Sequence, residues 1–213
     1  MRAVQPEAGI AERTLKAAQR GDIGAFNTLA LSYQRQLFNV CYRMLGNPED
    51  AADATQDALI AAFRGLRTFN GAATGLRAWM LRIAMNTCYD HLRRRQRRAA
   101  DSLDAMGVHE PERDSHTAQR VADPRIGPEQ QSLNAETARQ IQAAIDCLPP
   151  DQRLTVILCD VQGFSYDEAA QVMAIELGTV KSRLSRARAQ LRELLLQKGE
   201  LPASAQRLHE RNL

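Results

Sequence analysis

Basic and hydroxyl side chains recur at helical spacing near the end of this chain. At about 100° per residue, one side of a predicted helix carries Lys181, Ser182, Ser185 and Arg186. Lysine and arginine can contact phosphates or guanine edges, and serine can contact any base. Arg188 flanks this side, where phosphate contacts are more common than base contacts. These residue types in this pattern indicate a helix that enters the major groove of DNA.

Two helix-start signals position this basic helix. Ser165 is a suitable N-cap, and Glu168 stands three residues later, as a capping box requires. A second start signal follows at Gly178-Thr179, after a short link. The apolar side of the basic helix carries Val180, Leu184, Ala187, Leu191, Leu194 and Leu195. An ordinary amphipathic helix with a solvated basic face is the alternative, but the capped helix before it and the tight turn favour a helix-turn-helix.

A stripe of acidic and amide side chains lies on the helix expected at residues 49–66. Its members are Asp50, Asp53, Gln56, Asp57 and Ile60. Acids in the first turn of a helix favour its dipole and are usually only solvated. A mixed acidic and apolar stripe could equally dock a basic partner helix. The residues alone leave both interpretations open.

An aromatic, amide and arginine face follows on the helix expected at residues 76–98. It comprises Trp79, Arg82, Asn86, Tyr89, Asp90 and Arg93. Rings stack on unpaired bases, amides read base edges and arginines hold phosphates, so this face is suited to single-stranded nucleic acid. The alternative is that Trp79, the only tryptophan, is a core anchor, and that Tyr89 only packs.

Helical periodicity covers most of the chain, and strand signals are absent. The expected helices lie at residues 11–20, 25–45, 49–66, 76–98, 134–148 and 151–161, the last with Asp151 as N-cap, followed by the helix-turn-helix. Residues 99–133 are polar and acidic, which is typical of a flexible linker. The prediction is an all-α protein with two small helical domains, 1–98 and 134–198, a flexible acidic linker between them and a polar tail at 199–213.

Composition excludes several functional classes. The net charge is only +3, so the two separate basic blocks matter more than the total. The four cysteines form no Cys-x-x-Cys pair, and the four histidines have no ligand spacing with them, so no zinc site is expected. No phosphate loop or activated nucleophile indicates an enzyme, and no cofactor is expected. Buried free thiols, with no secretory leader and no membrane span, indicate a cytoplasmic protein.

Four segments of the chain occur in a recognisable order: Asp50–Ala58, Arg77–Asn86, Leu148–Arg153 and Gly178–Arg188. Together they resemble the extracytoplasmic-function (group IV) sigma factors of the bacterial sigma-70 family. The resemblance implies that the chain binds the RNA polymerase core and directs promoter-specific initiation. The implied partners are the clamp helices of the β′ subunit, the β flap, promoter DNA and an anti-sigma factor.

The resemblance also implies roles for particular residues. The stripe from Asp50 to Ile60 would dock on the polymerase core. The residues implied at the −10 element are Phe69, Asn70, Trp79, Arg82, Asn86 and Arg93. The residues implied at the −35 element are Thr179, Lys181, Ser182, Ser185, Arg186 and Arg188. The acidic segment from Asp101 to Glu129 would thread the polymerase cleft, where a negative strand can sit like nucleic acid.

The chain departs from the family at a few positions. Ala174 and Glu176 stand in the turn where relatives commonly have glycine and proline, so Ala174 must take the turn without glycine's freedom. Ala72, Ala73 and Leu76 replace residues that are often polar or aromatic near the −10 loop. A two-domain helix-turn-helix regulator that acts without polymerase is the competing function. Such a regulator would need neither the acidic stripe nor the Trp79 face.

Overall fold

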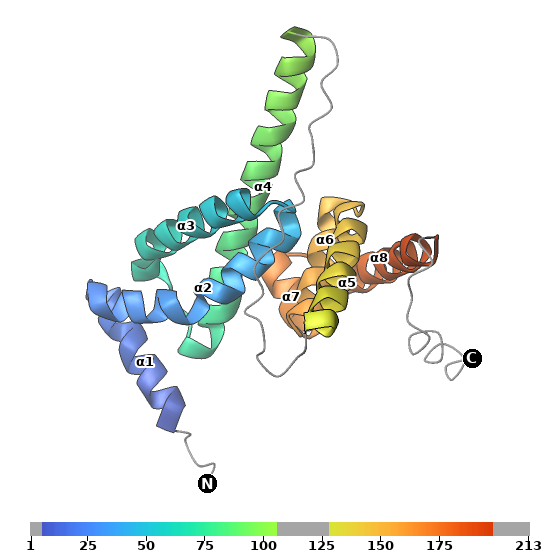
Figure 1. Ribbon diagram of the computed structural model, residues 1–213. Helices are drawn as coiled ribbons and strands as arrows, with labels where there is room; N and C mark the ends of the chain where they lie inside the picture. Colours follow the sequence, from blue (N-terminus) through green and yellow to red (C-terminus); the bar gives the residue numbers. More distant parts are fainter. Residues whose placement is uncertain (1–5, 106–127, 198–213) are drawn as a thin grey trace. The chain divides into compact units, whose positions relative to one another are not determined.

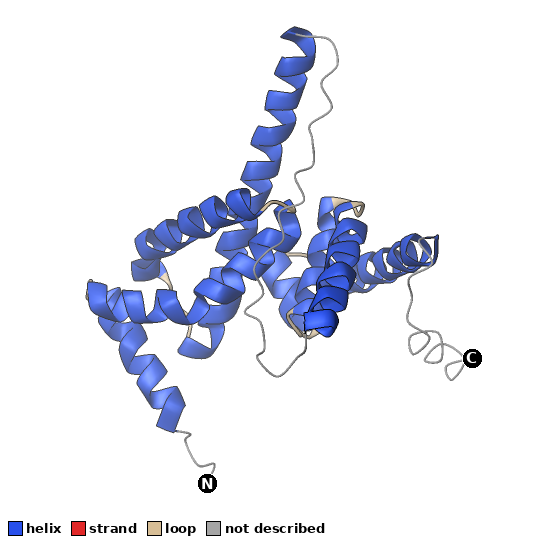
Figure 2. Ribbon diagram, in the orientation of Figure 1, coloured by secondary structure: helices blue, strands red, loops and turns tan. Residues whose placement is uncertain are grey.

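The structure is a computed structural model that describes residues 6–105 and 128–197. The first part contains α1 (Pro6–Gln19), α2 (Ile23–Leu45), α3 (Pro48–Gly65), η1 (Leu66–Thr68) and α4 (Ala73–Ala105). The second contains α5 (Pro128–Asp146), α6 (Pro150–Val156), η2 (Ile157–Val161), α7 (Tyr166–Met173) and α8 (Leu177–Gln197). Every regular element in these ranges is helical (Figure 2), and the chain divides into two compact units. The predicted all-α class with two helical domains is confirmed.

In the first unit, α2, α3 and α4 pack on one another, and α1 packs mainly on α2. Local signals set where these helices begin and end. Asp22 caps α2 by accepting a bond from the Ala25 amide at 3.0 Å. Gly46 ends α2 in the left-handed region, with φ 74°. Asn47 caps α3, because its side-chain oxygen accepts hydrogen bonds from the backbone amides of Glu49 and Asp50. Small buried residues let α3 approach its neighbours closely: Ala51, Ala54, Ala58 and Ala62.

Helix α4 is longer than its pattern predicts. It was expected at residues 76–98 and extends from Ala73 to Ala105. Its green C-terminal part projects beyond α2 and α3 (Figure 1). The arginines of this part are exposed up to Arg98, as expected where a helix has no neighbour to cover its charged sides.

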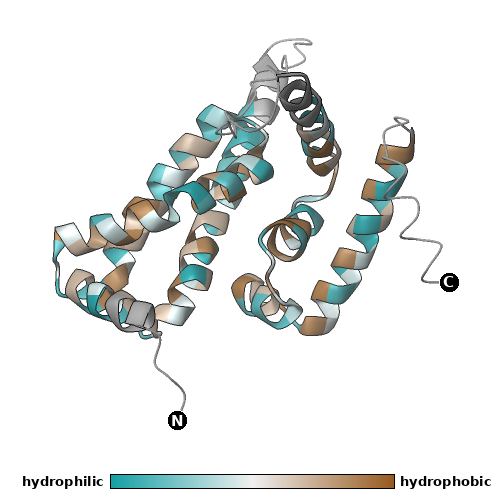
Figure 3. Ribbon diagram, turned by 60° about the horizontal axis from the view of Figure 1, so that its bottom comes forward, coloured by the Kyte–Doolittle hydropathy of each residue, from teal (hydrophilic) through white to brown (hydrophobic). Residues whose placement is uncertain are grey.

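The second unit is built around one apolar cluster beneath α8. The cluster contains Leu148, Val156, Leu184 and Ala187, with Cys159 and Leu191 packed against it. Apolar and polar residues alternate along α8 at helical spacing, which appears as brown and teal bands in Figure 3. The chain between α6 and α7 passes through η2, a single wide turn with π-helical hydrogen bonds. Such turns are frequent at functional positions.

The predicted starts of α1, α5 and α6 were wrong. Helix α1 was expected from residue 11 and begins at Pro6. Asp151 is not the N-cap of α6, because Pro149 occupies that position and Pro150 is the first helical residue. Proline suits the first turn, since its fixed φ fits the helix and its missing N–H loses nothing there. Likewise α5 begins at Pro128 rather than at residue 134.

The flexible linker predicted at residues 99–133 is therefore helical at both of its ends. Its central part, 106–127, lies outside the described residues, as does the tail from residue 198. The acidic role predicted for this segment stays a prediction. Within the two described ranges, no helix is both long and apolar enough to cross a membrane.

Candidate nucleic-acid interface

The side of α8 that was predicted to face DNA is exposed, and its other side is buried. Val180 and Ala187 have no exposed surface, and Leu184 is nearly as buried. Thr179, at the start of the helix, is half-buried. The exposed side carries Lys181, Ser182, Ser185 and Arg186. The predicted orientation of this helix is confirmed, and its contact with DNA stays a prediction.

The exposed side of α8 has basic edges and a hydroxyl centre. At about 100° per residue, Lys181 and Arg186 lie at its two edges, with Ser182 and Ser185 between them. In the described part of the chain, no ion pair engages Lys181 or Arg186. Long cations at the edges can reach phosphates on both sides of a groove, while the small serines let the helix sit close to base edges.

Arg188, which was predicted to contact phosphate, is held by a carboxylate of its own unit. Its Nε lies 3.1 Å from Asp160 Oδ2, and Nη2 lies 2.5 Å from Asp160 Oδ1. Bidentate pairs of this kind are the strongest arginine–carboxylate geometry. Donating hydrogen bonds to the Asp160 carboxylate raises the pKa of Arg188 above its already high ordinary value. Sequence reasoning missed this pair, because 28 positions separate its members.

Other residues of α8 also have partners that periodicity does not reveal. Arg183 Nη2 lies 2.7 Å from Asp151 Oδ2, which joins α8 to the first turn of α6. Ser182 Oγ donates to the carbonyl oxygen of Thr179 at 3.0 Å. With its proton directed into the helix, the Ser182 hydroxyl presents its oxygen as an acceptor, for which a base amino group is the suitable donor.

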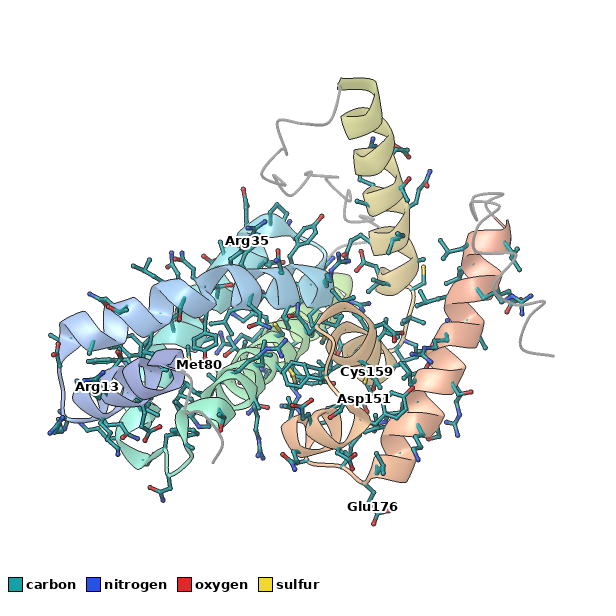
Figure 4. The ribbon with its side chains drawn as sticks, turned by 90° about the horizontal axis from the view of Figure 1, so that it is seen from below. Arg13, Arg35, Met80, Asp151, Cys159 and Glu176 are labelled. Carbon is teal, nitrogen blue, oxygen red and sulfur yellow. The ribbon has the colours of Figure 1, made fainter. Side chains whose placement is uncertain are left out.

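Helix α7 begins and ends as the sequence predicts. The amide of Glu168 donates to Ser165 Oγ at 3.3 Å, and the Ser165 amide donates to the Glu168 carboxylate at 2.8 Å. Ala174 ends α7 in the left-handed region, at φ 54° and ψ 46°. Glu176 is exposed in this turn, and its side chain points away from the ribbon (Figure 4). The strained position expected for Ala174 is confirmed.

In the first unit, Phe69 and Trp79 are brought together. Phe69 lies in the short loop between η1 and α4, and its ring centroid is 5.0 Å from that of Trp79, with planes inclined by 44°. Trp79 is half-buried against Gly65, where an added Cβ would lie 3.3 Å from the indole ring. The indole is therefore partly a packing group, and the pair still leaves aromatic surface on which an unpaired base can stack.

The polar residues predicted at the same site lie at the surface of the loop and of α4. Asn70 is exposed directly after Phe69. Also exposed, on α4, are Arg82, Asn86 and Arg93. At 1.5 Å per residue, Asn86 lies about 10 Å further along the helix than Trp79. The loop and the helix together thus form a polar track that leads away from the aromatic pair.

The predicted docking stripe on α3 is exposed opposite the buried alanines. Asp53 and Asp57 are exposed, whereas Asp50 is half-buried. Ile60 keeps 48% of its surface accessible and so adds apolar surface beside these acids. Exposed acids beside exposed apolar surface can receive a basic amphipathic partner, so the docking role stays a prediction with this support.

Sequence reasoning missed the share of α2 in this surface. A groove of about 380 Å³ lies between α2 and α3 and is lined by Leu31, Gln34, Arg35, Phe38, Ala52, Thr55, Gln56 and Leu59. Leu31 is 72% exposed, and Gln56 belongs to both the groove and the stripe. The sequence did contain a signal for this exposure. Leu37, Val40 and Met44 form the buried row of α2, and Leu31 does not lie on that row.

Asp57 has a second role that only the packing of α3 on α4 reveals. Its Oδ2 lies 3.3 Å from Nε2 of His91, and the histidine side chain is only 17% exposed. The contact is an ion pair when the imidazole is protonated. Asp57 therefore joins two helices of the unit as well as belonging to the exposed stripe.

No group of three or more His, Cys, Asp or Glu side chains in the described ranges could hold a metal ion. Cys41 and Cys88 are buried, and a hydrogen bond between these thiols, together with burial, raises the pKa of Cys88. Burial and the nearby Asp160 carboxylate raise the pKa of Cys159 as well. The raised pKa values keep the Cys88 and Cys159 thiols protonated and unreactive at neutral pH, whereas the hydrogen bond with Cys88 lowers the pKa of Cys41.

Comparison with known proteins agrees with this geometry. Residues 29–98 match the family Sigma-70 region 2, and residues 138–191 match Sigma-70, region 4. The ECF RNA polymerase sigma factor SigE of Mycolicibacterium smegmatis is 33% identical over 171 residues, which are 80% of this chain and 62% of that protein. The RNA polymerase sigma-H factor of Pseudomonas aeruginosa is 34% identical over 177 residues, which are 83% of this chain and 89% of that protein.

A solved structure gives the same result. The sigma factor RpoE from Bartonella quintana, in complex with the anti-sigma factor NepR, has a TM-score of 0.62 and 29% sequence identity, covering 81% of this chain and 98% of that one. Two region matches in the family's order, and relatives of this identity over most of their length, show that the chain belongs to the ECF RNA polymerase sigma factors.

Proposed function

We propose that this chain is the promoter-reading subunit of a bacterial RNA polymerase, directing initiation through two DNA contacts. The observation that carries the proposal is that α8 exposes a side with basic and hydroxyl residues. The other unit of the same chain presents the Phe69–Trp79 aromatic pair. One surface is suited to duplex DNA and the other to unpaired bases. The polymerase supplies the chemistry, and the chain acts in the cytoplasm, where transcription takes place.

Unit two reads the −35 element in this proposal. The side of α8 between Lys181 and Arg186 enters the major groove, and the buried opposite side holds the helix on its own domain. Arg183 and Arg188 form ion pairs with carboxylates of their own unit, so they stabilise its fold and do not contact bases. This leaves base readout to few side chains, which favours a short recognition element.

Unit one captures the −10 element after strand separation. Phe69 and Trp79 offer a stacking surface, and Asn70 and Asn86 offer amides that can read base edges. Arg82 and Arg93 follow on α4, where they can hold the backbone of the unpaired strand. An unpaired base that stacks on these rings regains part of the stacking energy that it loses when it leaves the duplex. Such a surface therefore favours strand separation.

Docking on the polymerase core uses the stripe on α3 with the neighbouring groove. Exposed acids attract a basic helix, and the apolar lining beside them buries its hydrophobic residues. The clamp helices of the β′ subunit are the proposed occupant, and the β flap is the proposed contact of the second unit. The RpoE relative was solved with an anti-sigma factor, so an inhibitor of this kind is a further proposed partner.

Run-off transcription with core polymerase on a promoter library tests the proposal. We expect promoter-specific products that share a −35 and a −10 element. Lys181→Ala and Arg186→Ala should each reduce the use of these promoters about tenfold, since each removes a charged contact. Arg139→Ala is the matched control, because Arg139 is an exposed arginine of the same unit that lies on α5 and not on α8. A wild-type protein that gives no promoter-specific product would refute the proposal.

A further inference from the structure

Helix α1 reaches the loop that carries Phe69 through two polar side chains. Gln19 Nε2 donates to the Phe69 carbonyl oxygen at 2.7 Å, across 50 positions of sequence. The backbone amide of Ala73 donates to Glu12 Oε2 at 3.0 Å, across 61 positions. These bonds hold the loop where it leaves η1 and where it enters α4. Glu12 and Gln19 lie about two helical turns apart, so both project from the same side of α1.

The Glu12 bond is a helix cap supplied by another helix. Ala73 is the first residue of α4, and first-turn amides have no partner within their own helix. A carboxylate there satisfies one such amide and also interacts favourably with the helix dipole. The exact start of α4, and thus the end of the loop, therefore depends on a residue of α1.

The loop itself has little freedom to rearrange around Phe69. An added Cβ on Gly71 would lie 2.4 Å from Phe69 Cζ, so the ring lies directly over this glycine. Phe69 also contacts Trp79, with the ring centroids 5.0 Å apart. Because its carbonyl is bound by Gln19 and its ring contacts both Gly71 and the indole, the orientation of Phe69 is restricted, and Asn70 follows it directly.

Helix α1 is itself firmly placed. Leu15 is 1% exposed and Ala18 is 5% exposed, and the helix contacts η1 and α4 in addition to α2. Figure 4 shows α1, marked by Arg13, beside the first turns of α4, marked by the inward Met80. Glu12 also has an exposed surface partner in Lys16, at 3.5 Å. The whole of α1 precedes residue 29, where the family match begins.

We propose that α1 is a positioning element for the −10 loop, in which Glu12 and Gln19 set the direction of Phe69 and Asn70 and so determine base preference at the −10 element. The inference rests on the proposed promoter-reading function. Neither residue touches DNA; both act through the loop backbone. Base selectivity, rather than overall activity, is the property that these two side chains control.

The test combines base preference with the emission of Trp79, the only tryptophan of the chain. Glu12→Ala and Gln19→Ala should each shift Trp79 emission, because Phe69 moves against the indole. Each should also reduce discrimination between the best and second-best base at one −10 position roughly fivefold in run-off transcription, the effect of one lost hydrogen bond. Glu12→Gln keeps an acceptor oxygen for the Ala73 amide, so it should restore both properties.

Lys16→Ala is the matched control, since it breaks the surface pair of Glu12 and leaves the cap in place. Circular dichroism and thermal unfolding of every variant separate loop displacement from loss of the fold. The inference is overturned if the folded alanine variants keep wild-type emission and base preference, or if they lose activity equally for every base. A wild-type protein without promoter-specific products would refute the proposed function and the role in base choice, whereas Trp79 emission would still report the bracing of the loop.

Discussion

At the scale of single residues, the charge that α8 offers to DNA depends on which arginines have internal partners. Arg188 lies within reach of the surface, but its guanidinium is engaged in two bonds with Asp160. The Asp160 carboxylate therefore neutralises part of the positive charge of Arg188 in the absence of DNA. A phosphate must then compete with a well-placed carboxylate for the same hydrogen-bond donors. Asp160 thus acts as an internal competitor for the contact that was predicted for Arg188.

Asp160→Asn should strengthen binding to duplex DNA. The change removes one negative charge and releases the guanidinium of Arg188 for a phosphate. We expect a several-fold gain in affinity and a salt dependence that is steeper by about one unit of slope, the value for one added phosphate contact. Fluorescence anisotropy of labelled duplex across a range of salt concentrations measures both quantities.

Asp167→Asn is the control for this prediction, since it removes an equal charge from the exposed start of α7 without releasing Arg188. Its salt slope should stay nearer that of the wild type. Weaker binding by Asp160→Asn would contradict the prediction, and it would mean that Asp160 orients Arg188 toward DNA instead of competing for it.

At the scale of elements, the first helix of the helix-turn-helix, α7, has a well-capped start and a strained end. The capping box at Ser165 secures the beginning of α7. Its end requires Ala174 to adopt left-handed backbone angles, which cost about 1–2 kcal/mol for a residue with a Cβ. The packing of α7 on α8, with Ala169 and Val172 buried, compensates for this strain. The geometry between these helices, on which groove entry depends, is thus maintained at some cost in stability.

Ala174→Gly should stabilise the second unit by roughly 0.5–1 kcal/mol. Glycine removes the left-handed penalty, and its greater freedom in the unfolded chain offsets part of the gain. The expected rise in melting temperature is a few degrees for a domain of this size. Ala143→Gly, at an exposed position inside α5, should lower stability by about 1 kcal/mol. Equal effects of the two changes in thermal unfolding would contradict this account.

At the scale of the whole molecule, the chain consists of two compact helical units, each with a buried core. The proposed bipartite recognition requires this arrangement, because the proposed −35 and −10 surfaces belong to different units. The unit with the proposed docking stripe also carries the aromatic loop, which would link core binding to DNA opening. The other unit would contribute the duplex contact.

Each unit should fold by itself. Fragments that correspond to residues 1–116 and 117–213 are expected to be helical, and their summed circular dichroism should match that of the full chain. Each should unfold in one cooperative transition. A fragment that lacks helical signal, or a sum well below the spectrum of the full chain, would show that one unit needs the other in order to fold.

Sequence patterns alone were sufficient for the helices and for the side that most of them bury. The capping box at Ser165, the strained Ala174 and the exposed side of α8 could be predicted, since caps, turns and a period of 3.6 residues are local properties. Helix boundaries were less accurate, as α4 and α5 show. Whether these helices extend beyond their periodic part depends on flanking residues with weak patterns.

Only the tertiary structure decided which side chains meet. Arg188 with Asp160, Asp57 with His91, and Gln19 with the Phe69 carbonyl join positions that lie far apart in the sequence. No periodicity encodes these partners, because they depend on how one helix crosses another. The sequence by itself determined the surfaces that this sigma factor presents. The packing of the helices decided which arginines remain available on these surfaces and how the loop that carries Phe69 is held.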